Sequence, residues 1–132
     1  MTFELWSLFA AAILGIIHLS AASFAFKAQV GNKYSVGPRD EAIQRSGLAG
    51  RLHRAQTNFL ETFGVFAVFI LLVHLTDVHG VQSYWGSILY IVGRILFLPL
   101  YAFGVPWIRT FSWNIATLGL VLVGAQVVVG NV

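Results

Sequence analysis

Three polar side chains share one face of a long apolar helix near the middle of the sequence. Arg54, Asn58 and Glu61 are spaced four and three residues apart within the stretch 50–66, GRLHRAQTNFLETFGVF. At about 100° per residue, this spacing places them within roughly 60° of arc on one side of a helix. The helix then continues into VFAVFILLVHL, which contains no Asp, Glu, Lys or Arg. A cation, an amide and a carboxylate that enter so apolar an environment need partners, and together they could hold a charged ligand.

A further cation, Arg94, lies in the middle of another apolar segment. Insertion scales assign about 2.5–3.5 kcal/mol to an Arg at the centre of a membrane helix. Such a residue normally faces the protein interior and has a partner. Glu61 is the carboxylate deepest in an apolar segment, so we expect an Arg94–Glu61 pair. Tyr101 follows Arg94 by seven residues and therefore lies on the same helix face.

Arginine outnumbers carboxylate among these groups. Four cations accompany the single carboxylate Glu61: Arg51, Arg54, Arg94 and Arg109. An unpaired buried charge is costly, so a purely structural network would be closer to neutral. Because guanidinium groups bind carboxylates with paired donors, the surplus predicts an anionic ligand.

Two structural interpretations compete with this one. Arg94, Glu61 and Asn58 could serve only as contacts between helices, which stabilise membrane bundles by about 0.6 kcal/mol each on average. Arg51 and Arg54 could instead extend to lipid phosphates, although Arg54 shares its helix face with Asn58 and Glu61. Taken singly, these residues fit either interpretation, and it is their grouping that favours a ligand.

The composition indicates a single integral membrane domain. Of 132 residues, 58% are hydrophobic and 10% are charged, whereas soluble domains carry about 25% charged residues. The net charge of +3 does not indicate nucleic-acid binding, because six of the eight cations fall between positions 27 and 54, as in a topology signal. The chain has no cysteine, and its four histidines show no HxxxH or HExxH spacing, so we predict no metal site.

The apolar segments predict an all-α fold with four membrane spans in a single domain, 1–132. The expected spans are 5–30, 48–75, 84–104 and 110–129. Short connections favour antiparallel neighbours and an up-down bundle. The loop 31–47 and the turn 105–109 carry Lys and Arg, whereas the connection 76–83 carries neither. The positive-inside rule therefore places the two basic connections in the cytoplasm and both termini on the opposite side, which in a bacterium means the inner membrane.

These residues resemble a known family. The octapeptide RAQTNFLE at 54–61, preceded by Arg51, is similar to the signature of the MAPEG family, the membrane-associated proteins in eicosanoid and glutathione metabolism. The loop GNKYSVGPRDE is similar to that of bacterial members, and the resemblance covers almost the whole chain. It implies a homotrimer of four-helix protomers, with glutathione bound between neighbouring subunits and open to the cytoplasm.

The resemblance also implies roles for single residues. The positions that it assigns to glutathione binding are Arg51, Arg54, Gln56, Asn58, Glu61, Arg94 and Tyr101. It implies that Arg109 stabilises the glutathione thiolate, with the hydroxyl of Thr110 as a possible helper. A further cation from the end of the first span would be Lys27 or Lys33.

Three function classes follow from this resemblance and from the residues. The first is a glutathione transferase, or a glutathione-dependent peroxidase, that acts on lipophilic electrophiles. Such an enzyme would contact membrane lipids and would need no metal. The second is a non-catalytic protein of the same fold that binds lipid or glutathione. Phe97 is compatible with this class, because many members of the family carry a hydroxyl at this position. A small transporter or channel ranks last, because the span 110–129 offers few polar residues for a pore.

Overall fold

The protein is entirely helical. A computed structural model describes all residues, 1–132. The helices are α1 (Phe3–Val30), α2 (Asn32–Val36), α3 (Gly47–Leu75), α4 (Val81–Ala102) and α5 (Pro106–Gly130). All but α2 are long and apolar enough to cross a membrane. The chain is therefore an integral, multi-pass membrane protein of the all-α class.

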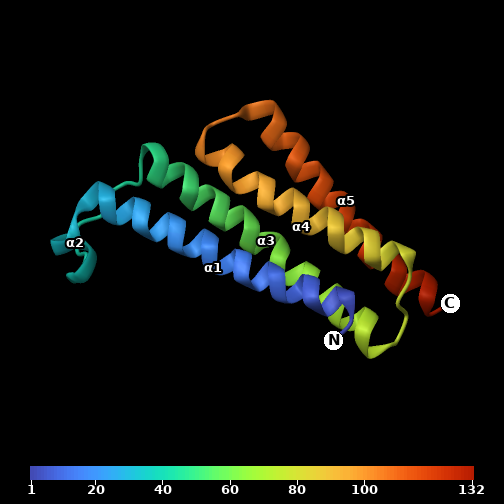
Figure 1. The fold of residues 1–132 in the computed structure, drawn as a ribbon. Helices are drawn as coiled ribbons and strands as arrows, with labels where there is room; N and C mark the ends of the chain where they lie inside the picture. The colour runs from blue at the N-terminus through green and yellow to red at the C-terminus, as the bar shows by residue number, and fades with distance from the viewer.

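The four long helices run antiparallel to their neighbours along the chain, as Figure 1 shows. Both termini lie at one end of the bundle, close to the connection between α3 and α4, while α2 lies at the opposite end. The helices associate as two pairs, because α4 packs most extensively against α5, and α1 against α3. We call the end with both termini the terminal end and the end with α2 the loop end.

Each helix buries a narrow stripe and exposes apolar residues elsewhere. In α1 the buried positions recur every three or four residues, which is one helix face. They are Glu4, Ser7, Ala11, Leu14, His18, Ala22 and Phe26. The opposite face exposes large apolar side chains such as Ile16 and Phe24. A helix with apolar residues on both faces suits lipid on one side and protein on the other, and it explains the weak hydrophobic periodicity of the sequence.

The pair α4–α5 is held together by close approach of backbones. A Cβ atom added to Gly86 would lie 2.7 Å from the carbonyl oxygen of Gly119, and one added to Gly93 would lie 2.7 Å from the backbone nitrogen of Ala116. Both distances are too short for any side chain. Small residues that permit such approach are typical of helix contacts in membranes. The Ser112 hydroxyl adds a bond of 2.6 Å to the Gly93 carbonyl oxygen.

Helix boundaries differ from the sequence expectation at all three connections. Helix α4 begins at Val81 and ends at Ala102, whereas the sequence predicts 84–104. The loop 31–47 is not wholly irregular, because α2 forms between Gly31, with a φ of 85°, and Gly37, which precedes Pro38. The final helix begins at Pro106, four residues earlier than expected, since proline is favourable in the first turn of a helix. Arg109 therefore lies in the first turn of α5 and not in a connecting turn.

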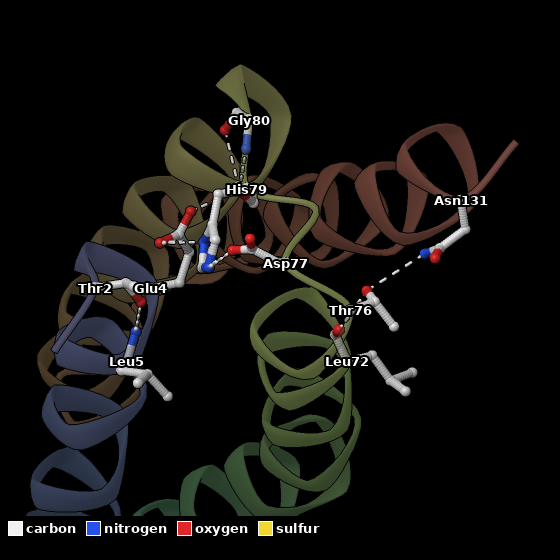
Figure 2. Close-up of polar contacts among 10 residues, drawn as sticks. Thr2, Glu4, Leu5, Leu72, Thr76, Asp77, His79, Gly80 and Asn131 are labelled. Atoms are coloured by element: carbon white, nitrogen blue, oxygen red, sulfur yellow. Dashed lines mark hydrogen bonds and ion pairs between the residues drawn. The ribbon is translucent and has the colours of Figure 1, made fainter.

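The terminal end is closed by a polar cluster, drawn in Figure 2. Glu4 of α1 is 5% exposed, and its Oε1 accepts a hydrogen bond of 2.7 Å from the Ser83 hydroxyl of α4. Its Oε2 lies 3.1 Å from Nδ1 of His79, whose Nε2 lies 3.9 Å from Asp77 Oδ1. This cluster joins α1 to the connection between α3 and α4 at the level where the helices leave the apolar layer.

Candidate functional site

Arg94 forms the centre of a buried polar network between α3 and α4. Its side chain is completely buried. One terminal nitrogen donates a hydrogen bond of 2.7 Å to Asn58 Oδ1, and the other donates a bond of 2.6 Å to the Thr62 hydroxyl. The expected Arg94–Glu61 ion pair is wrong: both ion pairs of the chain involve His79, and Glu61 is exposed. Neutral oxygens one turn apart on α3 are better placed for Arg94 than the carboxylate.

Aromatic rings flank the same guanidinium. The Arg94 guanidinium carbon lies 5.7 Å from the ring centre of Tyr90 and 5.4 Å from that of Phe97, distances at which a cation is attracted to a ring face. The hydroxyls of Tyr90 and Thr62 are 3.1 Å apart and share a hydrogen bond. Tyr90, Arg94 and Phe97 follow one another at spacings of four and three, so a single face of α4 supplies all of them.

A second cluster lies nearer the loop end, around Tyr101 of α4. Arg54 donates a hydrogen bond of 3.3 Å from Nε to the Tyr101 hydroxyl. The guanidinium carbon of Arg109 lies 4.6 Å from the centre of the Tyr101 ring. Arg51 Nε donates a bond of 2.9 Å to the carbonyl oxygen of Ala102, which ties α3 to the end of α4. The structure thus brings Arg51, Arg54 and Arg109 from α3 and α5 to one end of α4.

These three arginines have no carboxylate partner within the chain. Neither ion pair of the protein includes any of them. Arg54 is exposed, while Arg51, Arg109 and Tyr101 are half-buried. Guanidinium groups held by a tyrosine hydroxyl, a ring face and a carbonyl oxygen keep donors free for an anion. Their planar donor pairs suit carboxylate groups, and their combined positive charge favours the ionised form of a bound acid.

Three other predicted site residues lie outside the Tyr101 cluster. Glu61 is exposed on α3, two turns further into the apolar segment than Arg54. Gln56 faces away from Arg54 and lines an apolar groove of about 380 Å³ between α1 and α3. The Thr110 hydroxyl is exposed and donates a bond of 3.0 Å to the Pro106 carbonyl oxygen. A single chain therefore assembles part of the predicted site and leaves Gln56 and Glu61 on its outer faces.

The two lysines also lie apart from Tyr101. Lys27 is in the last turn of α1 and lines a cavity together with residues of the loop that follows. Lys33 is in α2 and is exposed. Neither makes an ion pair in the chain.

Sequence reasoning missed Thr62 and Tyr90 as parts of the polar network. Thr62 lies four residues after Asn58, on the face that already carries Arg54 and Asn58, so its position was readable from spacing. Tyr90 lies four residues before Arg94 and could have been found in the same way. His18 gave no such signal: it is completely buried and stacks on Phe59, with ring centres 4.7 Å apart.

Comparison with known proteins adds one finding. The model of the MAPEG family matches residues 3–129, which is almost the whole chain. No curated protein and no solved structure matches the chain.

Proposed function

The chain belongs to the MAPEG family, whose members are membrane proteins of glutathione and eicosanoid metabolism, and on that premise we propose that it is a glutathione transferase. It joins the glutathione thiolate to lipophilic electrophiles that reach the site from the bilayer. Glutathione is the co-substrate, and no metal takes part. The basic connections face the cytoplasm, so glutathione enters from the cytoplasmic side.

The observation that carries this proposal is the Tyr101 cluster. Arg54 and Arg109 come from different helices, both contact Tyr101, and neither has a carboxylate partner. Glutathione carries two carboxylates and, when its thiol ionises, a third negative charge. A tripeptide of this charge fits a site with a surplus of guanidinium groups.

Each predicted residue then has a role in binding. Arg51 and Arg54 bind the carboxylates of glutathione, and the Glu61 carboxylate accepts a hydrogen bond from its amino group. Asn58 offers its amide to the ligand while Arg94, bonded to its Oδ1, fixes its orientation. Tyr101 positions Arg54 by accepting its Nε–H.

In a homotrimer, neighbouring subunits would cover polar residues that a single chain leaves exposed. A carboxylate within a span rarely faces lipid, and Glu61 is exposed in the single chain. Gln56 likewise lies in an otherwise apolar groove. Neighbouring copies that cover these faces would place glutathione between subunits, where Gln56 of one copy can reach a ligand held mainly by the next.

In the reaction, the guanidinium of Arg109 lowers the pKa of the glutathione thiol, whose proton passes to water. The thiolate sulfur then attacks an electron-poor carbon of the substrate. A carbon–sulfur bond forms, and the electron pair leaves with a departing anion or, at an activated double bond, takes up a proton from water. Thr110 stands next to Arg109, and its hydroxyl could donate to the sulfur once it leaves the Pro106 carbonyl oxygen.

The test is the ultraviolet absorbance of thiolate when glutathione is added to the purified protein. We expect an absorbance increase for the wild type and its loss in Arg109→Ala, with conjugation slowed by about 10²–10³-fold, as when one transition-state donor is removed. The control is Asp77→Asn, which removes an exposed charge at the terminal end, away from the Tyr101 cluster, and which should behave as wild type. A wild type without thiolate absorbance, or an Arg109→Ala variant that keeps it, refutes the mechanism.

A non-catalytic protein that binds glutathione or lipid is the second candidate, and Phe97 favours it. Phe97 is 3% exposed and packs on Tyr101, with ring centres 5.3 Å apart, so this position offers no hydroxyl to a reacting group. A model electrophile separates the two candidates, because a binder retains glutathione without forming conjugate. A lipid hydroperoxide as substrate tests for peroxidase activity. In that reaction two glutathione molecules are oxidised to a disulfide, and the hydroperoxide is reduced to an alcohol and water.

A further inference from the structure

A basic cavity lies at the loop end, where α1 leaves the apolar layer, and none of its lining residues belongs to the Tyr101 cluster. Its volume is about 260 Å³. Cations and hydroxyls provide most of its lining: Ser23, Phe24, Phe26, Lys27, Ser35, Arg39 and Arg45. No carboxylate lines it. Three cations and two hydroxyls around one space form a site for an anion with several oxygens.

Arg39, which lines this cavity, has an unusual backbone conformation. Its φ is 56°, in the left-handed region that residues other than glycine seldom occupy. Its Nε and one terminal nitrogen both donate to the Ser35 carbonyl oxygen, at 3.1 and 2.8 Å. Strained residues persist where the surrounding structure fixes them, and they concentrate at ligand-binding sites. The guanidinium is therefore fixed before any ligand arrives.

Arg45 is also fixed. Its guanidinium carbon lies 4.5 Å from the ring centre of Phe26, and one terminal nitrogen lies 3.0 Å from Nδ1 of His53. The loop segment that carries Arg45 is fastened to α1 by Gln29, whose side chain donates to the Gln44 carbonyl oxygen at 2.8 Å and accepts from the Ser46 backbone nitrogen at 3.1 Å. A cavity built in this way loses little conformational entropy when it binds a ligand.

The charges at this end are not neutralised by the chain. Neither arginine of the cavity, nor Lys27, makes an ion pair. Glu41 lines a neighbouring cavity of about 520 Å³, which shares Arg39 and Arg45, but it does not line the smaller one. The smaller cavity therefore keeps a strongly positive interior.

The position of the cavity indicates the kind of anion that fits it. Lys27 lies in the last turn of the membrane-spanning helix α1, and Phe24, one turn earlier, is 68% exposed. An anion here lies at the depth of lipid headgroups, with apolar surface directly below it for an acyl chain. We propose that this cavity binds the phosphate of an anionic phospholipid, with one acyl chain along Phe24. The volume equals roughly nine liquid water molecules, which is ample for a phosphate and its glycerol.

This inference does not rest on the proposed glutathione chemistry, because Arg39 and Arg45 have no role in that chemistry and the readout is lipid retention. The test is native mass spectrometry of protein purified in detergent and incubated with phosphatidylglycerol or phosphatidylcholine. We expect the wild type to retain phosphatidylglycerol in preference to phosphatidylcholine. In the double variant Arg39→Gln, Arg45→Gln, retention should fall by roughly thirtyfold, about fivefold for each cation removed near a lipid phosphate.

Matched variants keep the test sharp. Lys33→Gln removes an exposed cation of α2 that lines neither of the two cavities, and it should retain phosphatidylglycerol like the wild type. Lys27→Gln changes α1 and not the loop, and a loss of about fivefold is expected even if the double variant misfolds.

Three results would overturn the assignment. One is unchanged phosphatidylglycerol retention in Lys27→Gln and the double variant. Another is displacement of the lipid by inorganic phosphate at equal concentration, which would mean that the cavity recognises an anion without acyl chains. The third is displacement by glutathione, which would make this cavity part of the glutathione site.

Discussion

At the terminal end of the bundle, the Glu4 carboxylate accepts a hydrogen bond from Ser83 and lies beside His79, which in turn lies beside Asp77. At the loop end, Arg51, Arg54 and Arg109 converge on the end of α4 without any carboxylate. The two clusters differ in how their charges are satisfied. One satisfies its charges with protein groups, and the other does not.

This difference separates structural from binding roles more clearly than burial does. A charged group whose partners belong to the same chain stabilises the fold, and its removal leaves those partners unsatisfied. A charged group without such partners adds little to stability and keeps its bonding capacity for a ligand. The buried network of Arg94 is intermediate, because its partners are neutral oxygens of Asn58 and Thr62.

The largest expected effect is on ligand binding at the loop end. Arg54→Ala removes a charged hydrogen-bond donor, which typically contributes about 1.5–3 kcal/mol and corresponds to roughly 10–150-fold weaker glutathione binding. The free energy of unfolding should change by less than about 0.5 kcal/mol, because Arg54 is exposed. Calorimetry and unfolding titrations in detergent measure the two quantities. If Arg54→Ala instead lowers the free energy of unfolding substantially, Arg54 has a structural role.

The opposite pattern is expected at the terminal end. Glu4→Ala leaves the Ser83 hydroxyl and His79 without their carboxylate, so unfolding should become easier by about 1–3 kcal/mol. Glutathione affinity should stay as in the wild type. Glu41→Ala, which removes an exposed carboxylate that makes no ion pair, is the matched control and should leave stability unchanged. Weakened glutathione binding in Glu4→Ala would break the comparison.

A smaller effect is expected in the network between the two ends. Thr62→Val keeps the shape of the side chain but removes an acceptor of Arg94 and the partner of Tyr90. Polar contacts within membrane bundles contribute about 0.6 kcal/mol on average and up to about 1.7, so we expect a loss of about 1 kcal/mol. Thr57→Val, whose exposed hydroxyl bonds only to the His53 carbonyl oxygen, should have no measurable effect. Equal stabilities of the two variants would show that the Arg94 network is not structural.

The all-α class, the membrane location and the family followed from composition, from the length of the apolar segments and from RAQTNFLE. These features depend on local sequence, and the family match over residues 3–129 agrees with them. The hydrogen-bond partners of the buried side chains could not be predicted from the sequence. Helix spacing placed Asn58 and Glu61 on one face, but which of them meets Arg94 depends on how α3 and α4 are rotated against each other, and that is a property of packing.

The terminal cluster was also outside the reach of sequence reasoning. Glu4 and Ser83 are 79 residues apart and belong to helices that are not consecutive. Neither residue type indicates such a contact by itself. Gln56 shows the reverse case, because the family pattern assigned it to the same site as Arg54, whereas the helix geometry turns it toward the groove between α1 and α3.

The glycine contacts between α4 and α5 have a consequence for motion. At Gly86 and Gly93 the two helices approach so closely that an added side chain would clash with backbone atoms of α5, and this close packing opposes sliding of one helix along the other. We therefore expect the pair α4–α5, which carries Tyr101 and Arg109, to move as one unit during uptake and release. Arg54 belongs to the other helix pair, so widening or narrowing of the cluster has to occur where the pairs meet, at the contacts of α3 with α4 and α5 and of α1 with α4.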